Sequence, residues 1–155
     1  MFRQMRRKEK QLSLEESLEI LNLADEGILA TTGPDGYPYA VPLNFVYHGG
    51  GIVFHCAKSG HKLDNINHNP RVSFCVVHES EIIPLSFSTR YKSVVVFGRA
   101  VELFDQKMEE GLLALVNKFS KDHVEAGKKY IDDSKHQTRV FTVKIEQITG
   151  KAGKK

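Results

Sequence analysis

The chain has 155 residues, of which 41% are hydrophobic and 26% charged, and its formal net charge is +3. This ordinary globular composition argues against a disordered, collagen-like or fibrous protein, and the length favours a single domain over residues 1–155. No apolar run approaches the roughly 20 residues of a membrane span, and the basic start leads into no signal-peptide core. We therefore expect a soluble, cytoplasmic protein with no membrane partner.

Much of the excess positive charge lies at the two ends, in an arm of about residues 1–12 and a tail of residues 151–155. Such ends can attract phosphate, but solvated termini are the favoured interpretation, so nucleic acid is not an expected partner. The two cysteines, Cys56 and Cys75, lie in apolar segments. They predict buried free thiols rather than a disulfide framework.

The first half of the chain predicts a helix followed by a three-stranded meander. Ser13 and Glu16 have the spacing of a capping box, and the apolar residues that follow recur at helical spacing until Gly27, which we expect to end the helix. Strands are predicted over residues 28–32, 37–47 and 52–57. The short turns between them favour antiparallel pairing.

The second half alternates helices and strands. Residues 61–68 predict a two-turn helix, and the mixed Pro, Ser and charged residues of 78–90 predict a long loop. Asp105 is expected to cap a helix with an apolar face, followed by a Lys-rich segment that is helical in part. Three more strands are predicted over residues 71–77, 91–104 and 140–148. Six mostly antiparallel strands with helices around them predict an α+β, mostly β domain, either a small barrel or an open sheet.

One short string has the composition of an anion-binding turn. In residues 58–62, Ser59 and free backbone N–H groups stand at a helix start, with Lys58, His61 and Lys62 within one turn. An ordinary helix cap with a solvated lysine explains the same string equally well. The Ser-x-x-Lys spacing also occurs in penicillin-recognising acyl transferases, but the chain is short for that fold and contains no Lys-Thr-Gly.

A metal site is not expected. His55 and Cys56 are neighbours on a predicted strand, so their side chains point to opposite faces, and the sequence has no Cys-x-x-Cys pair. Cys75 and His78 become ligands only if the fold brings another ligand close to them.

A set of ordered segments is similar to one known family. These segments are residues 30–38, 41–47, 53–57, 60–66, 69–72, 91–100 and 148–151. Together, from about Met5 to Lys151, they resemble the pyridoxamine-phosphate-oxidase-like flavoproteins and, within them, the nitroimidazole-resistance branch. The resemblance implies a six-stranded, Greek-key split β-barrel that forms a homodimer with FMN at the subunit interface. It does not distinguish FMN from FAD or a deazaflavin.

The resemblance also assigns residues to the cofactor. It gives Ser59, His61 and Lys62 to the flavin phosphate, and since the family often has Arg in place of His61, phosphate affinity is expected to be weaker or pH-dependent. The residues expected to lie along the isoalloxazine ring are Val41, Pro42, Leu43, Asn44, Phe54, His55, Cys56 and Ala57. Tyr91, Lys92 and Ser93 are expected to approach the cofactor from the long strand, with plain strand surface as the alternative.

The implied activity is flavin-dependent reduction of a small-molecule substrate. The branch suggests two-electron chemistry that takes the nitro group of a nitroimidazole to an amine, with His55 as proton donor or, alternatively, as a structural histidine. Pyridoxamine or pyridoxine phosphate oxidation is a second hypothesis, although the basic residues expected near the C-terminus of such oxidases are not evident in residues 150–155. A non-catalytic flavin or haem binder is the third.

Overall fold

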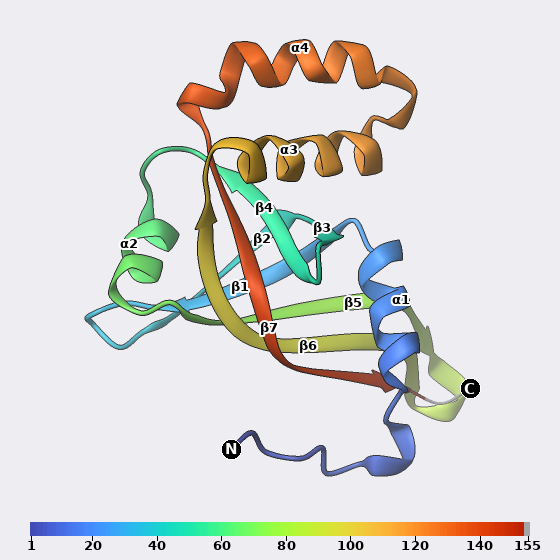
Figure 1. Cartoon of the computed structure of the whole chain (residues 1–155). Coiled ribbons are helices and arrows are strands. Elements are labelled where there is room, and N and C mark those ends of the chain that lie inside the picture. The colour runs from blue at the N-terminus through green and yellow to red at the C-terminus, as the bar shows by residue number, and fades with distance from the viewer. Residues whose placement is uncertain (154–155) are drawn as a thin grey trace.

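A computed structural model describes residues 1–153, which form one antiparallel sheet curled into a half-barrel with helices around it (Figure 1). The strands are β1 Glu26–Thr32, β2 Pro38–Asn44, β3 Val46–His48, β4 Gly51–Cys56, β5 Arg71–Ile83, β6 Ser88–Leu103 and β7 Arg139–Ala152. The α-helices are α1 Leu14–Leu23, α2 His61–His68, α3 Asp105–Phe119 and α4 Val124–Ser134. The predicted α+β class is confirmed. None of the helices within residues 1–153 is long and apolar enough to span a bilayer.

The sheet has seven strands in the order β2-β1-β5-β6-β7-β4-β3, so the predicted number of six is wrong. The difference arises within residues 37–47, predicted as one strand, because Phe45 separates β2 from β3. Phe45 is 0% exposed and anchors this crossing in the core. Since one residue spans only about 3.8 Å, the two edges of the sheet must come together here, which curls the sheet.

The predicted loop over residues 78–90 is also wrong. There β5 and β6 continue as a hairpin arm, with a bulge between His78 and Glu81 and a tight turn between Ile83 and Ser88. The arm extends beyond the core, and most of its residues are exposed. Its strands therefore lack the alternation of apolar and polar residues on which a strand prediction depends.

Helix α1 begins as expected but ends early. Ser13 and Glu16 form the predicted capping box, with 3.1 Å from the Glu16 nitrogen to Ser13 Oγ and 2.8 Å from the Ser13 nitrogen to Glu16 Oε2. Gly27 does not end the helix but lies inside β1. A Cβ atom there would lie 2.4 Å from the Phe74 ring, so the glycine is needed for packing.

The later helices follow the prediction with one exception. Residues 61–68 form α2 as expected, and the Lys-rich segment contains α4. Asp105 is not the cap of α3: the N-cap is Phe104, and Asp105 is the first helical residue, with φ of 52°. Neither residue's side chain caps the helix.

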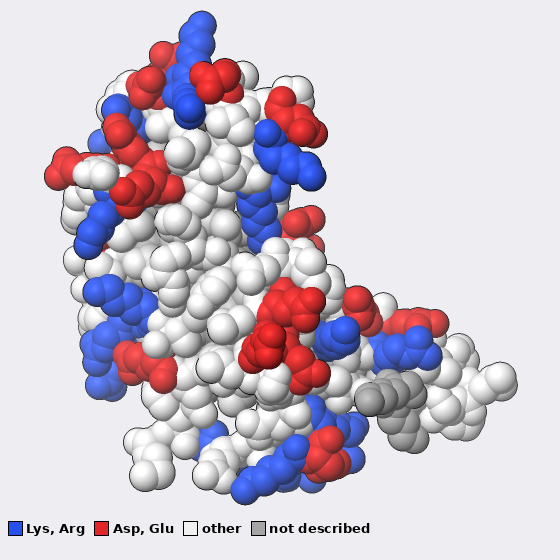
Figure 2. Space-filling view, turned by 45° about the vertical axis from the view of Figure 1, so that its right-hand side comes forward, with Lys and Arg blue, Asp and Glu red and all other residues white. Residues whose placement is uncertain are grey.

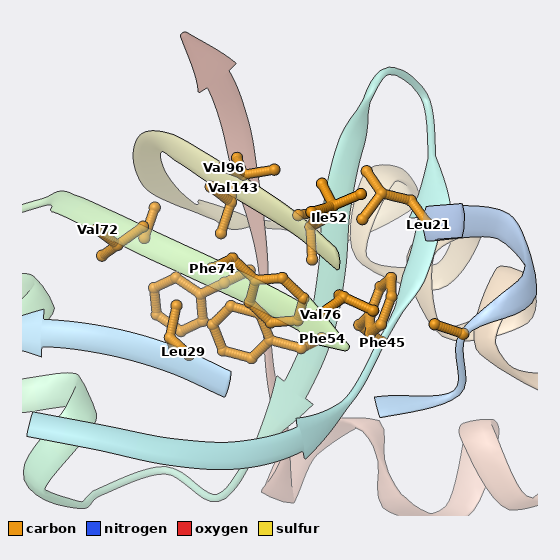
Figure 3. Close-up of a cluster of buried hydrophobic side chains, with 14 of the residues drawn as sticks. Leu21, Leu29, Phe45, Ile52, Phe54, Val72, Phe74, Val76, Val96 and Val143 are labelled. Carbon is orange, nitrogen blue, oxygen red and sulfur yellow. The ribbon is translucent and has the colours of Figure 1, made fainter. Parts of the chain in front are cut away.

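The main core fills the concave side of the half-barrel (Figure 3). Its fully buried side chains include Leu21, Leu29, Phe45, Ile52, Phe54, Phe74, Val76, Val94, Val96 and Val143. A second cluster of apolar side chains packs α3 against β3, β4 and β7, and Ile131 joins α4 to it. Figure 1 shows α3 between the sheet and α4. The free thiols Cys56 and Cys75 are partly buried, and burial raises the pKa of both.

Candidate functional site

The sheet is open between β2 and the end of β4. Strand β3 pairs with β4 only along Gly51–Val53, and β2 pairs only with β1 among the strands of residues 1–153. Residues 54–56 of β4 therefore have no paired strand on the edge that faces β2 and β3 in the described chain. On their other edge they pair with β7. We call this opening the gap. It leaves backbone N–H and C=O groups of β2 and β4 without strand partners.

Three observations show that β2, β4 and α2 meet at the gap. The rings of Tyr39 on β2 and His61 on α2 lie 4.0 Å apart, centroid to centroid. The positive charge of Lys62 on α2 acts on His55 of β4. Asn44 and His55, one from each wall of the gap, line the same hollow. The fold thus assembles these residues from three segments of the chain.

The start of α2 closes one end of the gap. Gly60 is the N-cap, and no side chain of residues 1–153 caps this helix, so its first N–H groups are available to an acceptor. With φ of 155° and open space where a Cβ would stand, Gly60 keeps the backbone accessible. Ser59 and His61 are exposed and Lys62 is partly buried. This arrangement can bind an anion such as a phosphate.

His55 points away from the core, whereas its neighbours in sequence do not. Phe54 is 0% exposed and lies in the main core (Figure 3), so it can reach a ligand in the gap only through its backbone. His55 is exposed on the surface but partly enclosed by its neighbours. This partial burial, together with the nearby Lys62 charge, lowers the pKa of His55 below 6.5. The imidazole is therefore mainly neutral at neutral pH. Cys56 is partly buried and Ala57 is exposed.

The predicted ring-lining residues of β2 alternate in exposure. Val41 and Leu43 are partly buried, whereas Pro42 and Asn44 are exposed. Pro42 has no N–H to donate to a further strand, which suits the edge of a sheet. Asn44 Nδ2 donates to the Asp25 carbonyl over 3.2 Å, which leaves the amide oxygen to accept.

Tyr91, Lys92 and Ser93 do not lie at the gap within one chain. Lys92 pairs with His78, which is seven residues along β5 from Arg71, the first residue of β5 after α2. Lys92 therefore lies about 23 Å along the strand from the end of β5 that is next to α2. Figure 1 shows α2 and the tip of the β5–β6 arm on opposite sides of the molecule. Lys92 forms an ion pair with Glu79 over 3.2 Å.

A partly buried ion pair between Arg139 and Glu102, called the brace, lies near the loop before α2 and is not evident from the sequence. Arg139 Nε and Nη2 each donate to a Glu102 carboxylate oxygen over 2.8 Å. Arg139 Nη1 also reaches the Lys58 carbonyl over 3.4 Å and so connects β7 to the loop before α2. Glu102 and Arg139 are 37 residues apart, and only the pairing of β6 with β7 brings them together.

The second unexpected feature is a hollow of about 730 Å³ between the walls of the gap and the two outer helices. We call it the α3–α4 hollow. Its lining consists of Asn44, His55, Leu115, Val116, Phe119, Ser120, His123, Ala126, Gly127 and Tyr130. No local sequence pattern indicates it, because the lining comes from strands and helices that are distant in sequence.

Charges of both signs are mixed over the surface. On the face drawn in Figure 2, Lys and Arg lie close to Asp and Glu, and uncharged residues cover much of the middle. Within residues 1–153, no three His, Cys, Asp or Glu side chains gather as a metal site would require.

A comparison with models of protein families identifies the family of the chain. The model of the family "Pyridoxamine 5'-phosphate oxidase" matches residues 13–152. The chain belongs to this family. The match confirms the resemblance found in the sequence, and it covers the gap, the start of α2 and the α3–α4 hollow. No curated protein sequence matches the chain.

Solved structures share the fold of this pyridoxamine 5'-phosphate oxidase family member. A protein named for 5-nitroimidazole antibiotic resistance from Bacteroides thetaiotaomicron has a TM-score of 0.76 and 21% identity, over 92% of this chain and 86% of that one. An FAD-binding protein from Mesorhizobium loti has a TM-score of 0.66 and 28% identity, over 94% and 98%. The FAD and heme binding protein from Mycobacterium smegmatis has a TM-score of 0.83 and 20% identity, over 94% and 74%.

Proposed function

We propose that the chain is a flavin-dependent oxidoreductase that binds FMN in the gap and reduces nitroaromatic or other small acceptors. The observation that carries this proposal is the geometry of the gap: two strand edges without strand partners meet an uncapped helix start beside Lys62. The family match and the FAD-binding neighbours support a flavin as the ligand.

The residues at the gap fit the two ends of a flavin. Ser59, Lys62 and the free N–H groups of α2 would hold the phosphate, with His61 fixed beside them by its contact with Tyr39. The open backbone edges of β2 and β4 would hydrogen-bond the polar edge of the ring system. Pro42 and Asn44 would lie along the ring, and Phe54 would contribute through its backbone.

His55 would act on the substrate beside the flavin. Bound flavin supplies two electrons at a time, which converts a nitro group with two protons to a nitroso group and water, so an amine needs three such steps. Because its pKa is lowered, His55 at neutral pH offers mainly a neutral N–H for hydrogen bonding. Proton transfer from His55 becomes more effective as the pH falls toward its lowered pKa.

A homodimer with the cofactor at the subunit interface would explain Tyr91, Lys92 and Ser93. They lie too far along β6 to reach the gap of their own chain. They could contact the same flavin only from a second copy.

A flavin or haem binder without turnover is a second candidate. An exposed, mainly neutral histidine such as His55 can ligate haem iron, and the structural neighbour from Mycobacterium smegmatis is named for both FAD and heme. Pyridoxamine phosphate oxidation is less favoured, because the α3–α4 hollow has no Lys or Arg in its lining for a substrate phosphate.

Purification and one redox cycle test the proposal. We expect yellow protein that releases FMN, identified by mass spectrometry, bleaches with dithionite or NADH and is reoxidised anaerobically by 2-methyl-5-nitroimidazole. Lys62→Ala should lower flavin occupancy more than Lys121→Ala, an exposed lysine between α3 and α4. Colourless protein that does not take up flavin would contradict the proposal, whereas stable flavin that the acceptor does not reoxidise, or a Soret band, would favour the second candidate.

A further inference from the structure

The α3–α4 hollow is a separate compartment that adjoins the gap. It shares Asn44 and His55 with the gap, but no residue of α2 is in its lining. A ligand in the hollow can therefore touch His55 without competing for the anion-binding start of α2.

The lining of the hollow has two histidines, His55 and His123, but no acidic side chain and no Lys or Arg. Four other hollows of residues 1–153 each include at least one Lys, Arg, Asp or Glu. A carboxylate or phosphate placed in the α3–α4 hollow would lose water with no Lys or Arg in the lining to pair with it, since Lys62 acts on His55 from outside the lining. The hollow thus favours a neutral ligand.

Two exposed aromatic side chains line the hollow. Phe119 and Tyr130 are 41% and 72% exposed and offer aromatic faces from α3 and α4. Between them α4 packs closely on α3, because a Cβ at Gly127 would lie 2.5 Å from a methyl group of Val116.

Two polar groups stand on the side of the hollow that faces the gap. Neutral His55 can donate an N–H, and the Asn44 amide oxygen can accept, since its nitrogen is engaged with Asp25. They provide hydrogen bonds for a substituent on the ring, next to the position proposed for the flavin.

We propose that the α3–α4 hollow binds the electron acceptor as an uncharged, planar aromatic molecule, with Phe119 and Tyr130 against its ring and His55 at its reducible substituent. This inference rests on the proposed function in treating the ligand as an electron acceptor. The binding site itself follows from the lining.

The test uses two probes of the same shape and different charge, 4-nitrobenzamide and 4-nitrobenzoate. Titrated into the FMN-loaded protein, the amide should shift the NMR signals of α3 and α4 and bind at least about tenfold more tightly than the carboxylate. Tyr130→Ala should weaken amide binding about tenfold and raise its KM more than it lowers kcat. Tyr37→Ala, a tyrosine of similar exposure on the β1–β2 turn, is the matched control and should change neither.

The FMN affinity separates this inference from the proposed function. If Tyr130→Ala weakens FMN binding instead, if both probes bind equally, or if Tyr37→Ala has the same effect, the hollow is not an acceptor site. If the wild-type protein does not bind FMN, the proposed function fails, and the same titration of the FMN-free protein still decides whether the hollow takes a neutral aromatic ligand.

Discussion

The brace between Glu102 and Arg139 gives a quantitative test of how the loop before α2 is held. The perturbation is a double-mutant cycle of Glu102→Gln and Arg139→Met, which removes the two 2.8 Å ion-pair contacts. Methionine keeps some of the packing of the arginine stem. Arg139→Met also removes the contact with the Lys58 carbonyl.

The expected coupling energy follows from geometry and exposure. The side chains of Arg139 and Glu102 are 34% and 21% exposed, so the pair is partly screened by water. A bidentate, charge-assisted pair of this kind should contribute about 1 kcal/mol, near the upper end for exposed pairs. For a chain of this size, a loss of about 1 kcal/mol lowers the melting temperature by about 2–4 °C.

Chemical and thermal denaturation of the four proteins measures this coupling. Arg99 and Glu146 provide a matched control on the same two strands, with one 3.0 Å contact and side chains 47% and 40% exposed. The coupling there should stay below about 0.5 kcal/mol. Equal coupling energies for the two pairs would refute the reasoning. In addition, Arg139→Met should weaken FMN binding, whereas Arg99→Met should not.

Three further predictions concern the gap and the core. Lys62→Ala should raise the pKa of His55, measured by NMR titration, but not to its ordinary value because burial is the larger cause of the shift; Lys121→Ala should leave it unchanged. The lowered pKa also means that the unfolded chain binds more protons than the folded one. The stability that His55 contributes is therefore complete above pH 6.5 and is lost as the pH falls through the folded-state pKa. His55→Gln should reduce the fall in melting temperature between pH 7.5 and about 5.5, and an unchanged fall would count against this linkage. Gly27→Ala should destabilise the protein by about 1–3 kcal/mol in urea denaturation, because its Cβ would overlap the Phe74 ring, and wild-type stability would show that the contact is not tight.

Local sequence signals predicted the parts of the fold that depend on local interactions. The capping box at Ser13 and the two turns of α2 could be read from spacing alone, because neighbouring residues determine them. The split of one predicted strand at Phe45 could not, since it depends on where the sheet curls. The β5–β6 arm was missed because its exposed strands carry no apolar face.

In the candidate site too, local features could be predicted from the sequence and features built from distant segments could not. Residues 58–62 could be predicted as a candidate anion-binding turn because their groups are consecutive in sequence. The partner of His61, Tyr39, and the brace from Arg139 come from other strands, so no local pattern reveals them. The α3–α4 hollow requires helices and strands that are distant in sequence and appears only in the folded chain.

Comparison of FMN with riboflavin, which lacks the phosphate, tests the central claim most directly. Fluorescence titration of the wild-type protein should give a dissociation constant for FMN at least about tenfold lower than for riboflavin, because charged hydrogen bonds at α2 hold the phosphate. In Lys62→Ala this ratio should shrink, mainly through weaker FMN binding. Equal affinities for FMN and riboflavin in the wild-type protein would contradict a flavin anchored by its phosphate at the start of α2.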